Sequence, residues 1–223
     1  MIEINQAIKL LPFYKLLNDE YKKKFIATSS VRKYKKDQEI LDSEGKCDKP
    51  FLVLLGSVSG LIKDEGERQI ILFDLYTKEM GILSATHLFD SISFNLTFVA
   101  NEETYLLMMN PLLLGNLMEE NIEIKCQIYE ILADRFSYSM STIYDLFFMR
   151  YEKRLANFLL DKYALIDRKV FRITQKEIAC LTNSIREVTG RTIRKFKNEG
   201  ILEYQRGKIR LLDIDKLRKI SGY

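Results

Sequence analysis

A stretch of nearly thirty residues beginning at Asn121 contains neither glycine nor proline, and it constrains the fold of this chain most strongly. Its apolar residues recur at helical spacing, at Ile124, Ile128, Ile131, Leu132, Phe136, Ile143, Leu146 and Phe147. This spacing predicts one continuous helix with an apolar stripe along its whole length. At a rise of about 1.5 Å per residue the helix is about 40 Å long. This is more than the small barrel predicted for the preceding residues, described in the next paragraph, can cover. We therefore expect two copies of the helix to pair in a parallel, coiled-coil-like dimer; the alternative is that the stripe packs on the chain's own barrel.

The sequence before this helix is divided into short runs of branched and aromatic residues. The runs are Val31–Tyr34, Phe51–Leu55, Val58–Ile62, Gln69–Phe73, Leu96–Val99 and Tyr105–Met109, with turn signals such as Asp64–Glu67 between them. Many short strands at nearly regular spacing predict a closed antiparallel sandwich or barrel. A short apolar helix from Ile4 to Leu17, interrupted by Pro12, is expected before it. Asn110 and Pro111 are typical of a helix start after it.

The charge of the chain is distributed unevenly. Residues 150–223 hold 19 Lys and Arg against 9 Asp and Glu, a net charge of +10, whereas residues 1–149 hold 16 against 22, a net charge of −6. A basic block of this size can neutralise phosphates and release condensed counterions, which is the sequence-independent part of nucleic-acid binding. The alternative is an ordinary surface on which lysines happen to gather in one domain.

Two patterns within the basic part predict a helix-turn-helix. Thr174–Glu177 is a capping box that starts one helix, and Ser184–Glu187 predicts a second capping box ten residues later. The first helix can therefore be only about two turns long, and the second is expected to end at Gly200. Asn183 tolerates the left-handed backbone of a tight turn, and Ala179 lets the two helices approach closely.

The second of these helices has two distinct faces. Thr189, Ile193 and Phe196 share one face, which we expect to be buried. Glu187, Arg191 and Arg194 have the same spacing on the opposite face, where arginine can bond guanine and glutamate can accept from the cytosine amino group. The phosphate-contacting residues are expected to be Arg194, Lys195, Lys197, Arg206 and Lys208. The last two lie in Ile201–Leu211, which alternates around an Arg-Gly turn and predicts a β-hairpin wing.

Composition excludes several other classes of protein. Hydrophobic residues make up 47% and charged residues 30% of the 223 residues, which is enough apolar surface for a core and argues against disorder. We find no apolar run long enough to span a membrane and no signal-peptide pattern at the N-terminus, so we expect a cytoplasmic protein. The cysteines Cys47, Cys126 and Cys180 are odd in number and form no CxxC pair, which does not indicate a disulfide scaffold.

The order of barrel, long helix, helix-turn-helix and wing resembles the cyclic-AMP receptor protein/Fnr superfamily of bacterial transcription regulators. The resemblance covers nearly the whole chain and is carried by Tyr34–Ile40 with Gly45, Phe51–Val58, Arg154–Leu160, Thr174–Ala179, Arg186–Glu187 and Gly190–Arg191. Ile185 departs from the serine usual in the family, and Val188 and Thr189 also differ.

The resemblance implies an α+β fold in three parts. It implies a cyclic-nucleotide-binding-like antiparallel β-roll, or double-stranded β-helix, with flanking helices over residues 1–120. It also implies a dimerisation helix over 121–149 and a winged helix-turn-helix DNA-binding domain over 150–223. In similar members the residues that match Arg186, Glu187 and Arg191 read a TGTGA-like half-site. The chain is thus expected to be a homodimeric regulator, not an enzyme, that binds double-stranded DNA and RNA polymerase.

The effector of such a regulator is harder to infer. Relatives that bind cyclic nucleotides use a Gly-Glu segment and an Arg-Ser pair, where this chain has Glu79 and Phe94–Asn95. Without the arginine a buried phosphate loses its charge-assisted hydrogen bonds, so we expect an apolar or small effector other than a cyclic nucleotide. Tyr129 and Phe136 of the long helix complete the candidate pocket.

No resident cofactor is expected. His87 is the only histidine, and no matched second ligand for haem accompanies it. An iron–sulfur cluster of the Fnr type needs four suitably placed ligands, whereas the chain has three scattered cysteines. Cys47 and Cys126 could form a thiol switch. The alternative is that they are small hydrophobic residues, which is the more common role of cysteine.

Two other functions stay open. A constitutive DNA binder would use the β-roll only as a scaffold for dimerisation and polymerase contact. A cupin-like binding protein or enzyme would need clustered histidines and carboxylates for a metal, and one histidine does not supply them.

Overall fold

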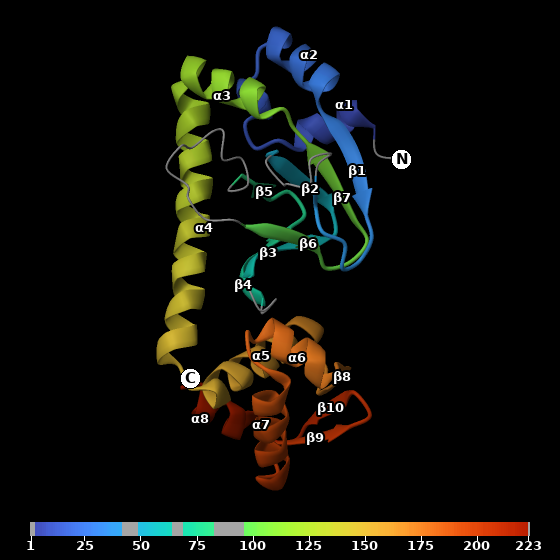
Figure 1. The fold of residues 1–223 in the computed structure, drawn as a ribbon, viewed down its shortest axis with the longest axis vertical. Helices are drawn as coiled ribbons and strands as arrows, with labels where there is room; N and C mark the ends of the chain where they lie inside the picture. The colour runs from blue at the N-terminus through green and yellow to red at the C-terminus, as the bar shows by residue number, and fades with distance from the viewer. Residues whose placement is uncertain (1–2, 42–48, 64–68, 83–95, 223) are drawn as a thin grey trace. The chain divides into compact units, whose positions relative to one another are not determined.

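The computed structural model describes residues 3–41, 49–63, 69–82 and 96–222. They form two compact units, Met1–Met140 and Ser141–Tyr223, and each unit has its own hydrophobic core. The boundary between them lies inside the long helix α4 (Ile122–Phe148), which is drawn in yellow in Figure 1. The fold is α+β as expected, with antiparallel sheets in the N-terminal unit and the helix-turn-helix in the C-terminal unit.

Seven described strands build the β-roll of the N-terminal unit. They are β1 (Ser30–Tyr34), β2 (Phe51–Leu55), β3 (Ser57–Lys63), β4 (Gln69–Tyr76), β5 (Met80–Gly81), β6 (Thr97–Ala100) and β7 (Thr104–Met108). One sheet has the order β1-β7-β2-β5, the other has the order β4-β3-β6, and all pairs are antiparallel. Phe51 of the first sheet meets Phe98 of the second edge to face, with ring centroids 5.1 Å apart. A Cβ at Gly81 would collide with the Phe51 ring, so glycine allows β5 to approach β2 here.

Helices pack against the four-stranded sheet. They are α1 (Ile4–Ala7), the 3-10 turns Ile8–Leu10 and Tyr14–Leu16, α2 (Asp19–Thr28) and α3 (Pro111–Glu120). Pro111 occupies the first position of α3, and the Asn110 side chain accepts from the Leu112 amide at 2.9 Å, as its sequence predicts. Helix α2 was not expected from the sequence. It begins after Asn18 and contributes Tyr21 and Phe25 to the core.

The apolar residues predicted to form one stripe on α4 differ in burial along the helix. Ile124 and Ile128 are fully buried in the core of the β-roll, and Ile131 and Leu132 pack against that core. Further along, Phe136 is 66% exposed and Phe147 is 79% exposed. The expectation of a single continuous stripe is therefore wrong, because the first part of the helix buries its apolar residues on its own β-roll.

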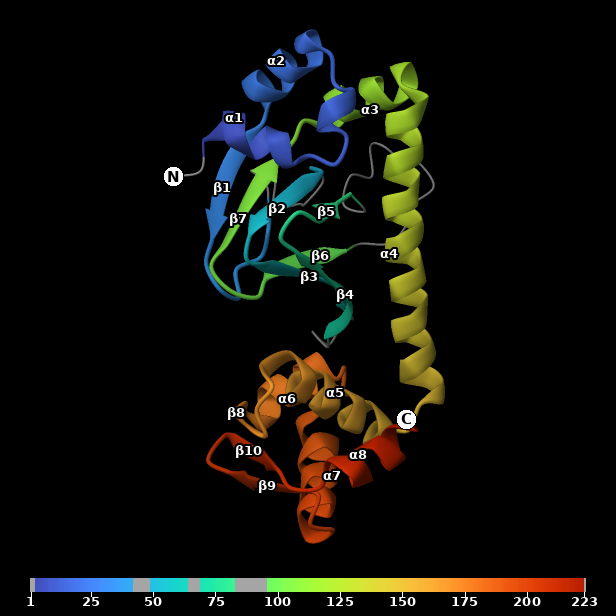
Figure 2. The ribbon, with the colours of Figure 1, turned by 180° about the vertical axis from the view of Figure 1, so that it is seen from behind.

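The C-terminal unit packs four helices against a small sheet, as Figure 2 shows from behind. Its elements are α5 (Tyr151–Ile166), β8 (Val170–Arg172), α6 (Gln175–Leu181), α7 (Arg186–Asn198), β9 (Leu202–Gln205), β10 (Lys208–Leu211) and α8 (Ile214–Ser221). The strand order is β8-β10-β9, and the core includes Leu155, Leu159, Ile178, Phe196 and Ile209. The predicted wing is present, and its turn at Arg206 and Gly207 has φ values of +48° and +73°, which suit a two-residue hairpin turn.

Candidate nucleic-acid interface

Helix α6 starts with the predicted capping box and ends in a tight turn. The Thr174 hydroxyl accepts from the Glu177 amide at 3.2 Å, and the Glu177 carboxylate accepts from the Thr174 amide at 2.7 Å. Asn183 has φ +48° in the turn, where the Ser184 amide donates to the Ala179 carbonyl at 2.8 Å. The chain therefore ends α6 after about two turns and redirects into α7.

The second predicted capping box, at Ser184, is wrong. Helix α7 begins at Arg186, its N-cap residue is Ile185, and no side chain caps it. Because the helix starts one residue later than Ser184 would require, Val188 and not Glu187 occupies the third helical position. Glu187 therefore has no capping role, and its carboxylate lies exposed in the first turn, where a negative charge suits the helix dipole.

The two faces of α7 are divided as the sequence predicts. Thr189, Ile193 and Phe196 are at most 2% exposed. Arg186, Glu187 and Arg191 are exposed, and none of the three has a hydrogen-bond or ion-pair partner among the described residues. The helix thus presents an exposed row of two guanidinium groups and one carboxylate that starts at its N-terminus.

The cations expected to contact phosphates differ in their surroundings. Lys195 forms an ion pair with Glu152 of α5 at 2.7 Å, and this carboxylate raises the pKa of the Lys195 ammonium. Arg194 is exposed, and its Nε donates back to the Gly190 carbonyl at 3.3 Å. Lys197 is exposed near the end of the helix. Lys195 is therefore already neutralised in part by its own domain.

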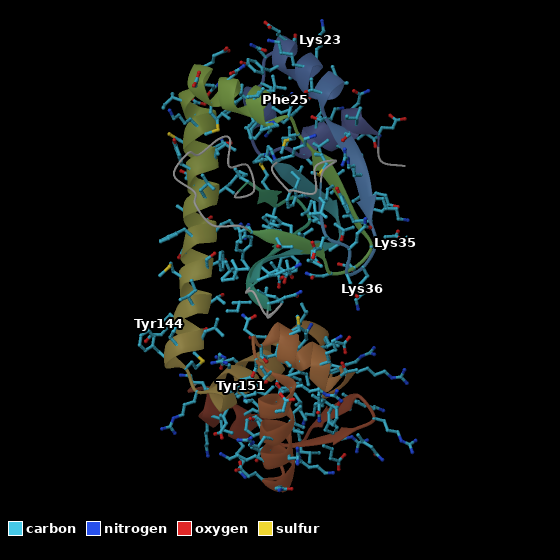
Figure 3. The ribbon with its side chains drawn as sticks, in the orientation of Figure 1. Lys23, Phe25, Lys35, Lys36, Tyr144 and Tyr151 are labelled. Carbon is cyan, nitrogen blue, oxygen red and sulfur yellow. The ribbon has the colours of Figure 1, made fainter. Side chains whose placement is uncertain are left out.

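A broad basic hollow of about 760 Å³ lies along the wing. Its cationic residues are Arg172, Lys197, Arg206, Lys208 and Arg210, and Glu203, Tyr204 and Gln205 complete its lining. The antiparallel pairing places Lys208 opposite Arg172 and Arg210 opposite Glu203, which forms an ion pair with Arg210 at 3.7 Å. The five cations against one carboxylate make the wing strongly electropositive, and Figure 3 shows nitrogen-tipped side chains extending from it.

A second hollow of about 500 Å³ joins the start of α6, Arg186 and the tip of the wing. Lys176, Arg186 and Arg206 line it together with Thr174, Gln175, Tyr204 and Gly207. The phosphate-contacting residues expected from the sequence did not include Arg172, Lys176 and Arg210. The three-residue strand β8 carries too weak a pattern to be predicted, and without it the register that brings Arg172 beside Lys208 cannot be inferred.

The predicted effector pocket is only partly brought together. The Glu79 carboxylate accepts from the Tyr76 amide at 2.8 Å and forms an ion pair with Arg135 of α4 at 3.1 Å. The Arg135 guanidinium also lies 6.0 Å from the centre of the Phe73 ring. Arg135 is thus an α4 residue in contact with Glu79 that was not predicted, and Tyr129 and Phe136 are 48% and 66% exposed. Phe94 and Asn95 lie outside the described residues.

The predictions about cofactors stay predictions. His87 and Cys47 lie outside the described residues, and Cys126 and Cys180 are exposed and form no disulfide among the described residues. Within the part of the chain that the structure describes, no group of three His, Cys, Asp or Glu side chains could hold a metal ion. Among the same residues, no helix is both long and apolar enough to cross a membrane.

Comparisons with known proteins agree with this architecture. The family described as the Crp-like helix-turn-helix domain matches residues 153–220. A crystal structure of a Crp/Fnr-family transcriptional regulator from Eubacterium rectale is 29% identical to this chain, with a TM-score of 0.87, over 96% of this chain and 100% of that one. Residues 153–220 thus belong to the Crp-like helix-turn-helix domain family, and the chain as a whole is similar to Crp/Fnr transcription regulators. Crp/Fnr proteins are transcription regulators, not enzymes.

Other Crp/Fnr proteins match over most of their length. The cAMP-activated global transcriptional regulator Vfr of Pseudomonas aeruginosa is 24% identical over 210 residues, covering 91% of this chain and 94% of Vfr. The c-di-GMP-responsive regulator CLP of Xanthomonas campestris shares the fold, with 19% identity and a TM-score of 0.70 over 88% of this chain and 100% of CLP. The exposed face of α7 and the basic wing therefore lie within the segment that matches the Crp-like helix-turn-helix domain.

Proposed function

We propose that this Crp/Fnr regulator binds an inverted-repeat DNA operator as a homodimer. The observation that carries the proposal is the exposed row Arg186, Glu187 and Arg191 at the start of α7, flanked by the two basic hollows. A recognition helix reads bases from its first turns, and cations beside it hold the sugar–phosphate backbone. In the N-terminal unit acidic residues outnumber basic ones, so the charge distribution favours this face for DNA.

The three side chains have distinct proposed roles. Arg186 and Arg191 can each bond O6 and N7 of a guanine, and Glu187 can accept from the N4 amino group of a cytosine. This set fits the guanines and the paired cytosine of a TGTGA-like half-site. The loss of the second capping box supports the role of Glu187, because its carboxylate is not held by a backbone amide.

The backbone contacts are proposed for Arg194, Lys197, Arg206 and Lys208. Arg172 of β8, Arg210 of the wing and Lys176 of α6 extend this set. Lys195 has a smaller proposed share, because Glu152 already compensates its charge.

Dimerisation is proposed to use a face of α4 that the β-roll does not cover. Its residues follow one another at alternating intervals of four and three, as Ile122, Cys126, Tyr129, Ala133, Phe136, Met140, Ile143 and Phe147. Ile122, Phe136 and Phe147 on this face are 66–79% exposed. A repeat of seven with apolar residues at two positions is the pattern of a coiled coil, so we name these eight residues the seam. Pairing through the seam would let two recognition helices reach successive major grooves about 34 Å apart.

The effector is proposed to be other than a cyclic nucleotide, on the evidence of Phe94 and Asn95 in the sequence. Vfr is named as cAMP-activated, so cAMP is the direct comparison. We expect cAMP at millimolar concentration to leave both the melting temperature and the operator affinity unchanged. A rise in either would overturn this part of the proposal. If no small molecule from a metabolite panel changes operator affinity, the constitutive binder becomes the better description.

Selection of bound sequences from random double-stranded DNA tests the main proposal. We expect the purified chain to enrich an inverted repeat with TGTGA-like arms. The Arg186→Ala and Arg191→Ala variants should lose the preference within the arms, whereas Lys197→Ala should keep it with weaker binding. Enrichment of a single, non-repeated site would contradict the dimer, and enrichment unchanged by the arginine variants would contradict the reading roles. RNA polymerase is a further proposed partner, tested by transcription from a promoter that carries the selected site.

A further inference from the structure

Three hydroxyl groups form a continuous hydrogen-bonded chain through the DNA-binding unit. The Tyr151 hydroxyl at the start of α5 lies 2.7 Å from the Thr189 hydroxyl of α7 and 2.9 Å from the Thr182 hydroxyl after α6. Thr189 is fully buried and Thr182 is 7% exposed. Figure 3 labels Tyr151 at the beginning of α5. The tyrosine therefore joins the two helices of the helix-turn-helix to the helix that precedes them.

A count of the hydrogen atoms gives the chain a direction. The Thr182 hydroxyl donates its hydrogen to the Ile178 carbonyl at 2.6 Å, so toward Tyr151 it can only accept. The Tyr151 hydrogen is then directed to Thr182, and Thr189 must donate to the Tyr151 oxygen. Thr189 donates to Tyr151, Tyr151 donates to Thr182 and Thr182 donates to the Ile178 carbonyl, so Tyr151 and Thr182 each both accept and donate, and such a chain strengthens its members cooperatively.

The other side of Tyr151 is tied to the end of α4. The Arg154 guanidinium lies 5.3 Å from the centre of the Tyr151 ring. Its Nη1 donates to the carbonyls of Asp145, Leu146 and Met149 at 3.3, 3.4 and 2.9 Å. These carbonyls belong to the last turn of α4 and the residue after it, where a helix leaves most acceptors without an amide of its own; the Asp145 carbonyl also accepts from the Met149 amide at 3.1 Å. Burial lowers the pKa of Arg154, whose side chain is committed to these contacts.

We propose that Tyr151 is a positioning residue that couples the last turn of α4 to the recognition helix α7. The path runs from the α4 carbonyls through Arg154 to the Tyr151 ring, and from the Tyr151 hydroxyl to Thr189 at the N-terminal end of the buried face of α7. Thr189 is two residues from Glu187 and Arg191, so a rotation of α7 about this anchor moves the proposed base-reading groups. Energetic coupling of this kind is reciprocal, so DNA at α7 must also affect the end of α4.

Hydrogen–deuterium exchange of the full chain tests the coupling without DNA. Arg154→Lys keeps the charge but loses the planar fork, and it touches no residue of α7 in the described contacts. We expect this variant to speed exchange in residues 186–198 about fivefold or more, the lower range of typical coupling. In a Tyr151→Phe background the same substitution should change exchange there by less than about twofold. An equal effect in both backgrounds would overturn the proposal.

A second arm adds a duplex carrying the selected inverted repeat and rests on the proposed function. In the wild-type chain we expect DNA to slow exchange in residues 141–149, and in Tyr151→Phe to protect residues 186–198 but not 141–149. Tyr163→Phe, a partly buried tyrosine of the same helix, is the matched control and should behave as wild type. No protection of 186–198 in the wild type would count against DNA binding by α7, and the DNA-free arm would still decide the coupling.

The double variant Tyr151→Phe/Thr189→Val separates positioning from stability. It removes the orphaned Thr189 hydroxyl together with its partner, so its melting temperature should return toward that of the wild type. The DNA-induced protection of residues 141–149 should remain lost. Recovery of both properties together would show that the hydroxyl chain only stabilises the unit and would overturn the proposal.

Discussion

Replacement of Phe136 by alanine tests the seam most directly, because this ring is large and 66% exposed in the single chain. A phenylalanine side chain has about 200 Å² of surface, so about 130 Å² remains to be covered. At about 25 cal/mol per Å² this corresponds to about 3 kcal/mol per copy and about 6 kcal/mol for a symmetric pair. The alanine methyl and relaxation of neighbouring residues recover part of this, and we take half, about 3 kcal/mol. The dimer dissociation constant should therefore rise about a hundredfold.

Sedimentation equilibrium over a range of protein concentrations measures this constant. Tyr138→Ala is the matched control, since Tyr138 is also an aromatic residue of α4 and is 61% exposed. It lies two residues further along, about 200° around the helix, and its ring contacts Arg135 with 5.8 Å between the guanidinium carbon and the ring centre. Alanine favours helix at both positions, so neither substitution should weaken α4 itself.

Two results would contradict a dimer held by the seam. If Phe136→Ala leaves the dimer dissociation constant within about threefold of the wild type, the seam does not hold the dimer, since 3 kcal/mol corresponds to about two orders of magnitude. If Tyr138→Ala weakens the dimer as much as Phe136→Ala, the opposite face of α4 takes part and the seven-residue pattern is not the cause.

Three further predictions concern the DNA-binding unit. Arg186→Ala and Arg191→Ala should each cost about 1–3 kcal/mol on the selected duplex and little on random duplex, measured by fluorescence anisotropy; equal losses on both would refute base reading. Lys197→Ala should lower the slope of log affinity against log salt by about one per protomer, whereas Lys195→Ala, whose ammonium pairs with Glu152, should lower it less; equal changes would contradict this difference. Thr174→Ala should reduce the free energy of unfolding by about 1 kcal/mol in urea titrations, with recovery in Thr174→Ser; an unchanged value would mean that the cap contributes nothing.

Local signals in the sequence predicted the elements whose boundaries are set by adjacent residues. The capping box at Thr174, the proline at the start of α3 and the Arg206–Gly207 turn each fix the backbone through side chains a few positions apart. The same kind of signal misled at Ser184, since a Ser-x-x-Glu pattern does not show at which residue the helix starts. In the structure the N-cap is Ile185, which has an extended backbone and no side-chain cap.

Structural features that depend on residues distant in sequence could not be predicted from local patterns. The apolar residues of α4 belong to two sets that alternate along part of the helix. One set is buried on the β-roll at Ile124 and Ile128, and the other is exposed along the seam. Periods of 3.6 and 3.5 residues are nearly equal over a few turns, so only the extent of the β-roll separates the sets. The pairing of Lys195 with Glu152, 43 residues away, likewise becomes visible only when α5 packs beside α7.

Helix α4 belongs to both units, so the proposed effector response and the proposed DNA binding need no other contact between the units. Ile124 and Ile128 fix the first part to the β-roll, and Arg135 ties it to Glu79. Arg154 holds the carbonyls at the other end of the same helix. An effector that binds two arrangements of α4 with different affinity shifts their populations by that difference alone, and about 1.4 kcal/mol gives a tenfold change. The seam and the hydroxyl chain have different proposed roles: the seam sets how many chains are paired, whereas Tyr151 sets how strongly a change in α4 affects α7.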